Sequence, residues 1–154
     1  KGEFNVLLPE EWLTQQFGTQ KFEDNFDKIK AKVLAKANSD KFKEPYYLFT
    51  HCTERALVTP APIMWQNLMN KFGLNLIPIN VACCGMAGLF GHIAKNHDET
   101  YAVYEKNWKG EIQKRDFNHC LITGFSCRSQ VLRMEGKRAN HPLFVLDELL
   151  KEAQ

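Results

Sequence analysis

Three short apolar segments, each followed by a turn and then by a longer amphipathic segment, constrain the fold of this chain most strongly. They are residues 46–50, 76–80 and 119–123. Such short apolar runs, bounded by Pro, Asn or Gly, are typical of buried strands. Strands that alternate with helices pair in parallel through right-handed crossovers. The pattern therefore predicts an α/β layered domain with a small, mostly parallel sheet of three to four strands flanked by helices.

The helices are predicted from apolar residues that recur every three or four positions. One helix has an apolar face of Phe22, Phe26, Ile29, Val33 and Ala37. Four more are expected at residues 60–72, 101–112, 128–135 and 142–150, with Gly73 and Gly136 as caps. Pro78 indicates an edge strand, and a weak fourth strand is expected at residues 138–140. We expect one domain over residues 1–154, with residues 1–44 as a helical lead-in packed on it.

Composition and charge exclude several classes of protein. Lys and Arg number 20 and Asp and Glu 18, and the basic residues are spread along the chain, so no nucleic-acid partner is expected. No apolar run approaches the roughly 18 residues that span a bilayer, and residues 1–4 lack the apolar part of a signal peptide. We therefore expect a cytoplasmic protein that does not span a membrane. The chain begins with Lys rather than Met, so we expect a fragment of a longer polypeptide.

Four of the five cysteines follow a predicted strand. Cys52 follows the first strand, Cys83 and Cys84 the second, and Cys127 the third. Because open parallel sheets bind ligands at the carboxyl ends of their strands, these four thiols are expected to converge. An odd number of cysteines without an export signal is a poor disulfide framework. Cys120 lies inside the third strand and is expected to be a small buried hydrophobe.

A site built from thiolates alone selects zinc or an iron–sulfur cluster. Zinc sites commonly use cysteine pairs two to four residues apart, which the adjacent Cys83 and Cys84 fit less well. In a cluster, neighbouring thiolates bind different irons, and Gly85 lets the backbone approach the sulfurs closely. We therefore expect Cys52, Cys83, Cys84 and Cys127 to bind an iron–sulfur cluster, with zinc as the alternative.

Other interpretations of these residues stay open. Gly85, Gly88 and Gly91 are compatible with a phosphate-binding loop, although their spacing is not a known nucleotide fingerprint. The four cysteines are also compatible with plain packing or with a thiol–disulfide switch, although adjacent cysteines rarely bridge each other. Lone histidines near helix ends are usually solvated or capping, so we do not expect metal ligation by His92, His97 or His141.

Three motifs of the chain resemble the cysteine-rich CCG domain of iron–sulfur oxidoreductases, a family that includes heterodisulfide reductase and the iron–sulfur component of glycolate oxidase. The motifs are THCTE at 50–54, CCGMAG at 83–88 and GFSCR at 124–128. They look closest to the C-terminal part of bacterial FAD-linked oxidases similar to D-2-hydroxyglutarate and D-lactate dehydrogenases. The resemblance implies an electron-transfer role, with flavin and ferredoxin-like domains of the same polypeptide or complex as partners. It also implies that FAD is bound upstream and not in this domain.

One position departs from that family, because Gly124 stands where the last motif usually has the first of two cysteines. The resemblance then implies a 4Fe-4S cluster held by four thiolates, or a zinc ion, and no proton-transfer residue in this domain. Arg128 at a helix start and His51 beside Cys52 are expected to lie near the cluster and tune its potential. The alternative is a zinc-bound or metal-free structural and interaction domain that completes the flavin dehydrogenase.

Overall fold

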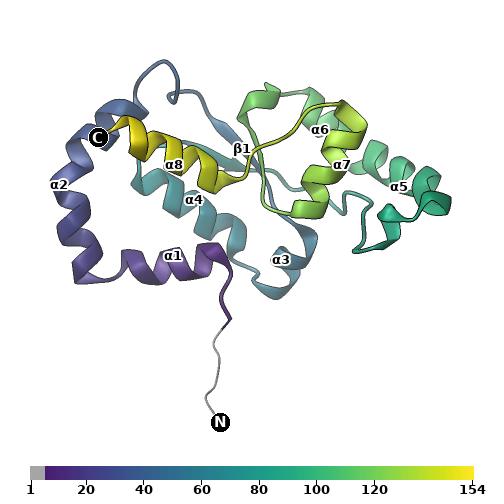
Figure 1. Ribbon diagram of the computed structural model, residues 1–154, viewed down its shortest axis with the longest axis horizontal. Coiled ribbons are helices and arrows are strands. Elements are labelled where there is room, and N and C mark those ends of the chain that lie inside the picture. Colours follow the sequence, from purple (N-terminus) through teal and green to yellow (C-terminus); the bar gives the residue numbers. More distant parts are fainter. Residues whose placement is uncertain (1–5) are drawn as a thin grey trace, which may run out of the picture.

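The computed structural model describes residues 6–154. Its centre is a three-stranded parallel sheet with the order β2-β1-β3, which lies between two groups of helices (Figure 1). The strands are β1 (Tyr46–Phe49), β2 (Leu76–Pro78) and β3 (Cys120–Ile122). The central strand β1 pairs in parallel with both neighbours. The predicted α/β fold is therefore confirmed, and Pro78 lies in an edge strand as its ring requires.

Helices cover both faces of this sheet. One group consists of α1 (Pro9–Phe17), α2 (Gln20–Ala37), α4 (Ala61–Lys71) and α8 (Pro142–Glu152) (Figure 1). The other consists of α5 (His97–Tyr104), α6 (Gly110–Gln113) and α7 (Phe125–Glu135), with a π-helical turn at Glu105–Lys109 between α5 and α6. The short helix α3 (Cys52–Leu57) follows β1, and 3-10 turns lie at Phe90–His92, Ala94–Asn96 and Phe117–His119.

The side chains of β1 contribute to two separate apolar clusters. Tyr46 and Leu48 belong to the cluster under α2, α4 and α8, whereas Phe49 belongs to the cluster under α5, α6 and α7. Successive side chains of a strand point to opposite faces, so one short strand supports both halves of the core. Burial on both faces also explains why the segment lacks polar alternation in the sequence.

The structure corrects two of the expected elements. The helix expected at residues 128–135 begins earlier, at Phe125, and therefore includes Cys127. The weak fourth strand expected at residues 138–140 is reduced to one isolated parallel bridge between Asn140 and Leu121. Gly136 ends α7 with a φ of 69°, as a glycine cap should.

Ile29 does not lie in the core as its spacing in α2 indicates. Phe26, Val33 and Ala37 of the same helix are buried, but Ile29 is 39% exposed. Its side chain lines an apolar groove of about 500 Å³ that α1, α2 and α8 form between them. The apolar stripe of α2 is therefore wider than the part that the core covers.

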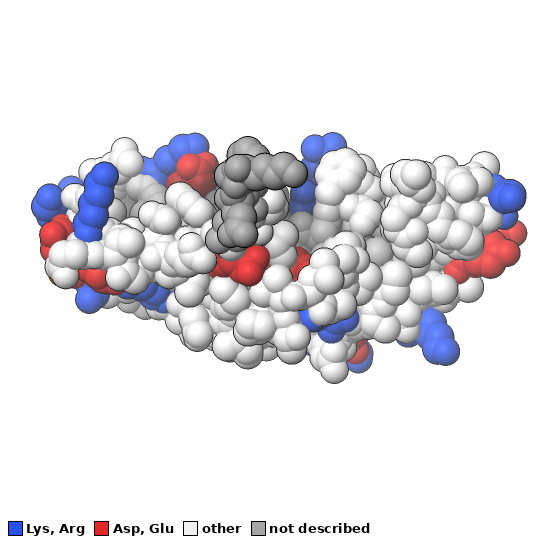
Figure 2. All heavy atoms as spheres, turned by 90° about the horizontal axis from the view of Figure 1, so that it is seen from below, with Lys and Arg blue, Asp and Glu red and all other residues white. Residues whose placement is uncertain are grey.

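The charged side chains form no single basic surface on the face seen from below in Figure 2, where Lys and Arg lie close to Asp and Glu at both ends. Three ion pairs of this kind connect the loop and helix around residues 36–41 to α8, through Lys36, Lys41, Glu148 and Glu152. Within residues 6–154, no helix is both long enough and apolar enough to cross a membrane.

Candidate metal centre

The three parallel strands end at one edge of the sheet, and a cysteine-bearing segment follows each of them. Cys52 is the first residue of α3, directly after β1. Cys83 and Cys84 lie in the irregular segment that follows β2. Cys127 lies in the first turn of α7, which follows β3. The placement that the sequence predicted for each cysteine relative to its strand agrees with the structure.

Cys84 and Cys127 form the centre of this group. Their Sγ atoms lie 3.2 Å apart, and the two residues are 2% and 1% exposed. The hydrogen bond with Cys127 lowers the pKa of Cys84 to about 7, whereas the same bond, together with burial, raises the pKa of Cys127. Of the two thiols, Cys84 is therefore the one that ionises more readily. A thiolate, not a thiol, is the form that binds metals.

Cys52 and Cys83 are half-buried beside this pair. Burial raises the pKa of Cys83, the backbone N–H of Gly85 partly offsets this, and negative charge on Cys84 and Cys52 raises it again. All five cysteines are free thiols. Among the described residues, no three or more His, Cys, Asp or Glu side chains are arranged to hold a metal ion. The structure thus gathers four thiols at one edge but places only Cys84 and Cys127 in contact.

Gly85 is required by the turn that carries Cys83 and Cys84. Its φ is 96°, and a Cβ at this position would lie 2.4 Å from the backbone oxygen of Thr100 in α5. Its N–H donates to Cys83 Sγ at 3.4 Å. Gly85 therefore allows the turn to pack against α5 while its amide faces a sulfur.

His51 lies at the start of α3 and contacts the beginning of α7. Its backbone N–H donates to Thr123 Oγ1 at 2.9 Å. A Cβ built on Gly124 would lie 2.7 Å from His51 Cδ2 and 2.9 Å from Cys127 Sγ. The His51 ring therefore fills the space beside Cys127 that a side chain at position 124 needs.

Arg128 connects the start of α7 to the end of β3. Its Nη1 donates to the backbone oxygens of Ile122 and Thr123 at 2.9 and 2.8 Å. Burial lowers the pKa of Arg128, and its interaction with Cys127 acts in the opposite direction. The guanidinium therefore interacts electrostatically with the cysteine group, while its hydrogen bonds go to backbone oxygens.

A pair of acidic residues, the buried Glu10 and the half-buried Glu54, supports the site, and the sequence analysis missed it. Glu54, two residues after Cys52, accepts hydrogen bonds from Trp65 Nε1 at 3.1 Å and from the hydroxyl of Thr123. Glu10 of α1 is 1% exposed, and its pKa is raised to about 7, first by burial and then by the charge of Glu54 and the hydrogen bond between the two carboxyls. This network joins α1, α3, α4 and the end of β3. Isolated acidic residues at these positions leave no periodic signal in a sequence.

The segment that leads to Cys83 is held by its backbone oxygens. Side chains from α3 and from the helical segment after α5 donate to three consecutive carbonyls. The pairs are Arg55 to Val81, Trp108 to Ala82 and Asn107 to Cys83. The position of Cys83 and Cys84 is thus determined from both sides of the sheet edge.

The remaining cysteine and one histidine have structural surroundings. Cys120 lies in β3, is 1% exposed, and has a pKa that burial raises to about 11, so it is the buried hydrophobe that its position predicted. His141 precedes α8, and its Nδ1 accepts a hydrogen bond from the N–H of Leu143 at 3.2 Å. The ring therefore caps that helix.

Comparison with known proteins gives matches among curated proteins. The chain is 40% identical over 151 residues to a protein of Escherichia coli K12, 40% over 150 residues to one of Pantoea ananatis, and 38% over 151 residues to one of Haemophilus influenzae. All three are D-2-hydroxyglutarate dehydrogenases. The matches cover 98%, 97% and 98% of this chain but only 13%, 13% and 14% of those proteins. No protein-family profile and no solved structure matches the chain.

These matches agree with the resemblance to bacterial 2-hydroxyacid dehydrogenases that the cysteine motifs indicate. They support the prediction that the chain is part of an oxidoreductase. The chain spans about an eighth of its relatives' length.

Proposed function

We propose that this chain is the cysteine-rich CCG domain of an FAD-linked 2-hydroxyacid dehydrogenase and that it transfers electrons. The observation that carries the proposal is the convergence of Cys52, Cys83, Cys84 and Cys127 at one sheet edge. The 40% identity to a segment of D-2-hydroxyglutarate dehydrogenase supports the class of enzyme. In this proposal FAD is bound elsewhere in the full-length polypeptide and oxidises the 2-hydroxy acid. Flavin and ferredoxin-like domains are then the partners of this one, in the cytoplasm.

The four thiols have the chemistry that a 4Fe-4S cluster needs. Such a cluster, when bound, accepts and releases single electrons. The lowered pKa of Cys84 favours its thiolate form, and its contact with Cys127 supplies two ligands from different strand ends. Binding would draw the half-buried thiols of Cys52 and Cys83 toward this pair. No residue of this domain acts in proton transfer to the substrate.

Three residues near the thiols are proposed to raise the potential of the cluster. Gly85 already donates its N–H toward a sulfur, and hydrogen bonds to sulfur favour the reduced, more negative state. Arg128 contributes positive charge beside Cys127. His51 covers the same cysteine with its ring. An Arg128→Ala variant with an unchanged midpoint potential would refute the tuning role of its charge.

A second candidate is a structural domain that holds zinc or no metal and completes the flavin dehydrogenase. Two observations favour it. The described residues present no ready group of three ligands, and Gly124 stands where the related motif has a fifth cysteine. In this alternative the Cys84–Cys127 contact is a packing contact of the second apolar cluster.

Iron, zinc and acid-labile sulfide analysis of anaerobically purified full-length protein distinguishes the two candidates. The first predicts iron and sulfide in near-equal amounts beyond those of the ferredoxin-like domains. It also predicts that a Cys83→Ser/Cys84→Ser variant loses this additional iron and sulfide and keeps the iron and sulfide of the ferredoxin-like domains. Cys120→Ala is the matched control, because Cys120 is a buried cysteine outside the proposed ligand set. Zinc in place of iron, or identical metal content in the variant and the native protein, would overturn the electron-transfer role.

A further inference from the structure

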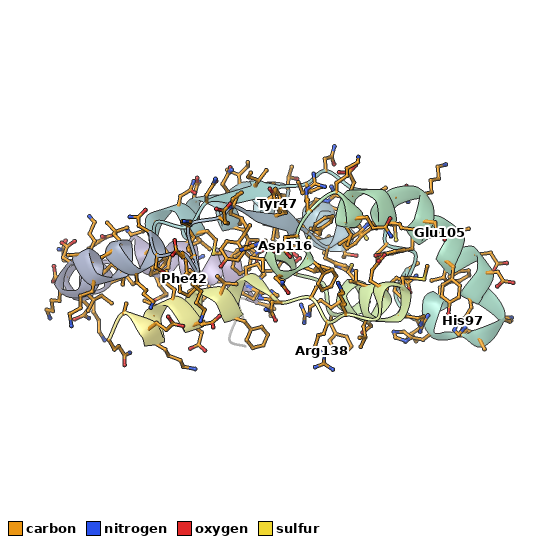
Figure 3. All side chains as sticks on the ribbon, turned by 90° about the horizontal axis from the view of Figure 1, so that it is seen from above. Phe42, Tyr47, His97, Glu105, Asp116 and Arg138 are labelled. Atoms are coloured by element: carbon orange, nitrogen blue, oxygen red, sulfur yellow. The ribbon has the colours of Figure 1, made fainter. Side chains whose placement is uncertain are left out.

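A second pocket lies beside the proposed metal centre, between α7 and the start of α8. Its volume is about 380 Å³, which is within the range of roughly 300–1,000 Å³ that small-molecule sites occupy. Apolar side chains form much of its wall, and two arginines and an amide lie among them. The residues that matter for its chemistry are Phe125, Leu132, Phe144, Arg128, Arg138 and Asn140. Figure 3 shows Arg138 projecting outward between α7 and α8.

The pocket carries positive charge without a matching carboxylate. No Asp or Glu lines it. Among the described residues, the ion pairs of arginine side chains involve Arg115 only, so neither Arg128 nor Arg138 is neutralised. Both guanidinium groups line the same pocket, so their like charges repel each other. A bound anion would remove this repulsion and accept charge-assisted hydrogen bonds from both.

The apolar part of the pocket is exposed to solvent. Phe125 is 75% exposed, Phe144 62% and Leu132 41%. Exposed apolar groups that gather at a concave site, rimmed by polar ones, commonly mark a binding site. Two phenyl rings and a leucine are suited to cover a flat apolar group. The guanidinium groups and the amide of Asn140 can then bind the polar group of the same ligand.

We propose that this pocket binds a small organic anion that joins a flat apolar body to a carboxylate or phosphate group. The concave shape favours a small molecule over a protein surface. The proposal does not depend on a metal at the cysteines, because none of the pocket residues named above is one of the proposed ligands. It places the anion next to α7, the helix that carries Cys127.

The proposal is tested with 1-naphthyl phosphate and 1-naphthoate, which carry the two possible head groups. Each is titrated into the 15N-labelled protein, with binding followed by NMR and by calorimetry. We expect at least one of them to bind with saturation, with shifts concentrated in residues 125–144, and the better head group identifies the class of ligand. Naphthol and inorganic phosphate should bind at least tenfold more weakly, because naphthol lacks the anionic group and inorganic phosphate lacks the apolar rings.

Variants of exposed residues separate recognition from folding. Arg138→Gln is expected to weaken binding of the better probe at least tenfold, and Phe144→Ala to weaken it several-fold. The neighbouring Lys137 is the matched control, because Lys137→Gln makes the same change of charge outside this pocket and should leave affinity within about twofold.

Three results would overturn the proposal. One is the absence of saturable binding of both anions up to about 10 mM. Another is equal affinity for the native protein and Arg138→Gln. The third is binding whose shifts lie in the apolar groove between α1, α2 and α8, since that would show the aromatic body alone to be recognised. All of these measurements compare folded proteins without added metal. If the anion proposal fails, the test of the proposed electron-transfer function by metal analysis therefore stays valid.

Discussion

The buried carboxyl of Glu10 gives a quantitative prediction about stability. This side chain is 1% exposed, its Oε1 has no hydrogen-bond partner within residues 6–154, and it faces the carboxyl of Glu54. Replacing it in Glu10→Gln keeps the shape and supplies an amide N–H to Glu54, but removes the ability to ionise. The substitution therefore isolates the cost of placing a second negative charge in this network.

The sign and size of the effect follow from the pKa. Folding raises the pKa of Glu10 from 4.5 to about 7, so between these values the folded state holds a proton that the unfolded chain has released. The stability that this group contributes is complete below pH 4.5 and is lost as pH rises to about 7. A difference of this size corresponds to about 3 kcal/mol of unfolding free energy. Glu10→Gln should therefore match the native protein near pH 4.5 and exceed its stability by about 3 kcal/mol at pH 8.

The assay is urea unfolding of the reduced, metal-free chain between pH 4.5 and pH 8.5, followed by tryptophan fluorescence. Cys84 has a pKa of about 7 and titrates within this range, but it does so in both proteins and cancels in the difference. Glu44→Gln is the control, because Glu44 is exposed and forms no ion pair with the other residues that the structure describes. Its difference from the native protein should stay constant with pH.

Parallel curves for Glu10→Gln and the native protein would refute the reasoning. They would mean that Glu10 ionises as readily in the folded protein as in the unfolded chain. A variant that is less stable at every pH would also refute it, because it would show that the carboxylate takes part in a favourable contact that the amide cannot replace.

Three further substitutions test local geometry by the same unfolding measurement. Gly85→Ala should lower the free energy of unfolding by more than about 2 kcal/mol, because the alanine has a positive φ and its Cβ meets the backbone oxygen of Thr100. Gly88→Ala, which also has a positive φ but open space around it, should lower it by about 1 kcal/mol. Equal losses would contradict the close approach of Gly85 to Thr100. Gly124→Ala should cost about 1–3 kcal/mol alone and less in a His51→Ala background, which removes the ring but leaves Cys127 Sγ at 2.9 Å. An additive double-mutant cycle would disprove the contact between the ring and position 124. Trp65→Phe should cost about 1–3 kcal/mol by leaving an oxygen of the half-buried Glu54 carboxylate without its donor, and a neutral result would show that the oxygen finds another.

The strands and their pairing could be predicted because their signals are local. Each strand is a short apolar run beside Pro, Asn or Gly, and the helices between them impose parallel pairing. That topology alone was enough to predict four thiols at one sheet edge. It was also enough to assign Cys120 to the core, since that residue lies within a strand rather than after one.

Two helices left no usable signal in the sequence. The helix α3 has six residues, none of them buried, so it has no apolar stripe to recognise. The only buried residue of α1 is Glu10, which is the opposite of the usual pattern. The helix expected at residues 101–112 begins earlier, at His97, and the 3-10 turns between Cys84 and α5 were not predicted.

The polar part of the site was equally hidden. Glu54 contacts Trp65 and Thr123, and Thr123 lies far away in the chain. Such contacts depend on tertiary structure and produce no periodicity. Gly124 stood out only as a missing cysteine, whereas the structure shows a physical reason for glycine there, which is the ring of His51.

The packing of His51 against Gly124 also bears on how this segment changes during evolution. A ring at position 51 and a side chain at position 124 compete for one space, so position 124 cannot gain a side chain while the ring is present. A lineage that gains a cysteine at 124 must first, or at the same time, accept a smaller or rotated residue at 51. The two positions are therefore expected to covary among relatives, with a bulky residue in one opposite a glycine in the other.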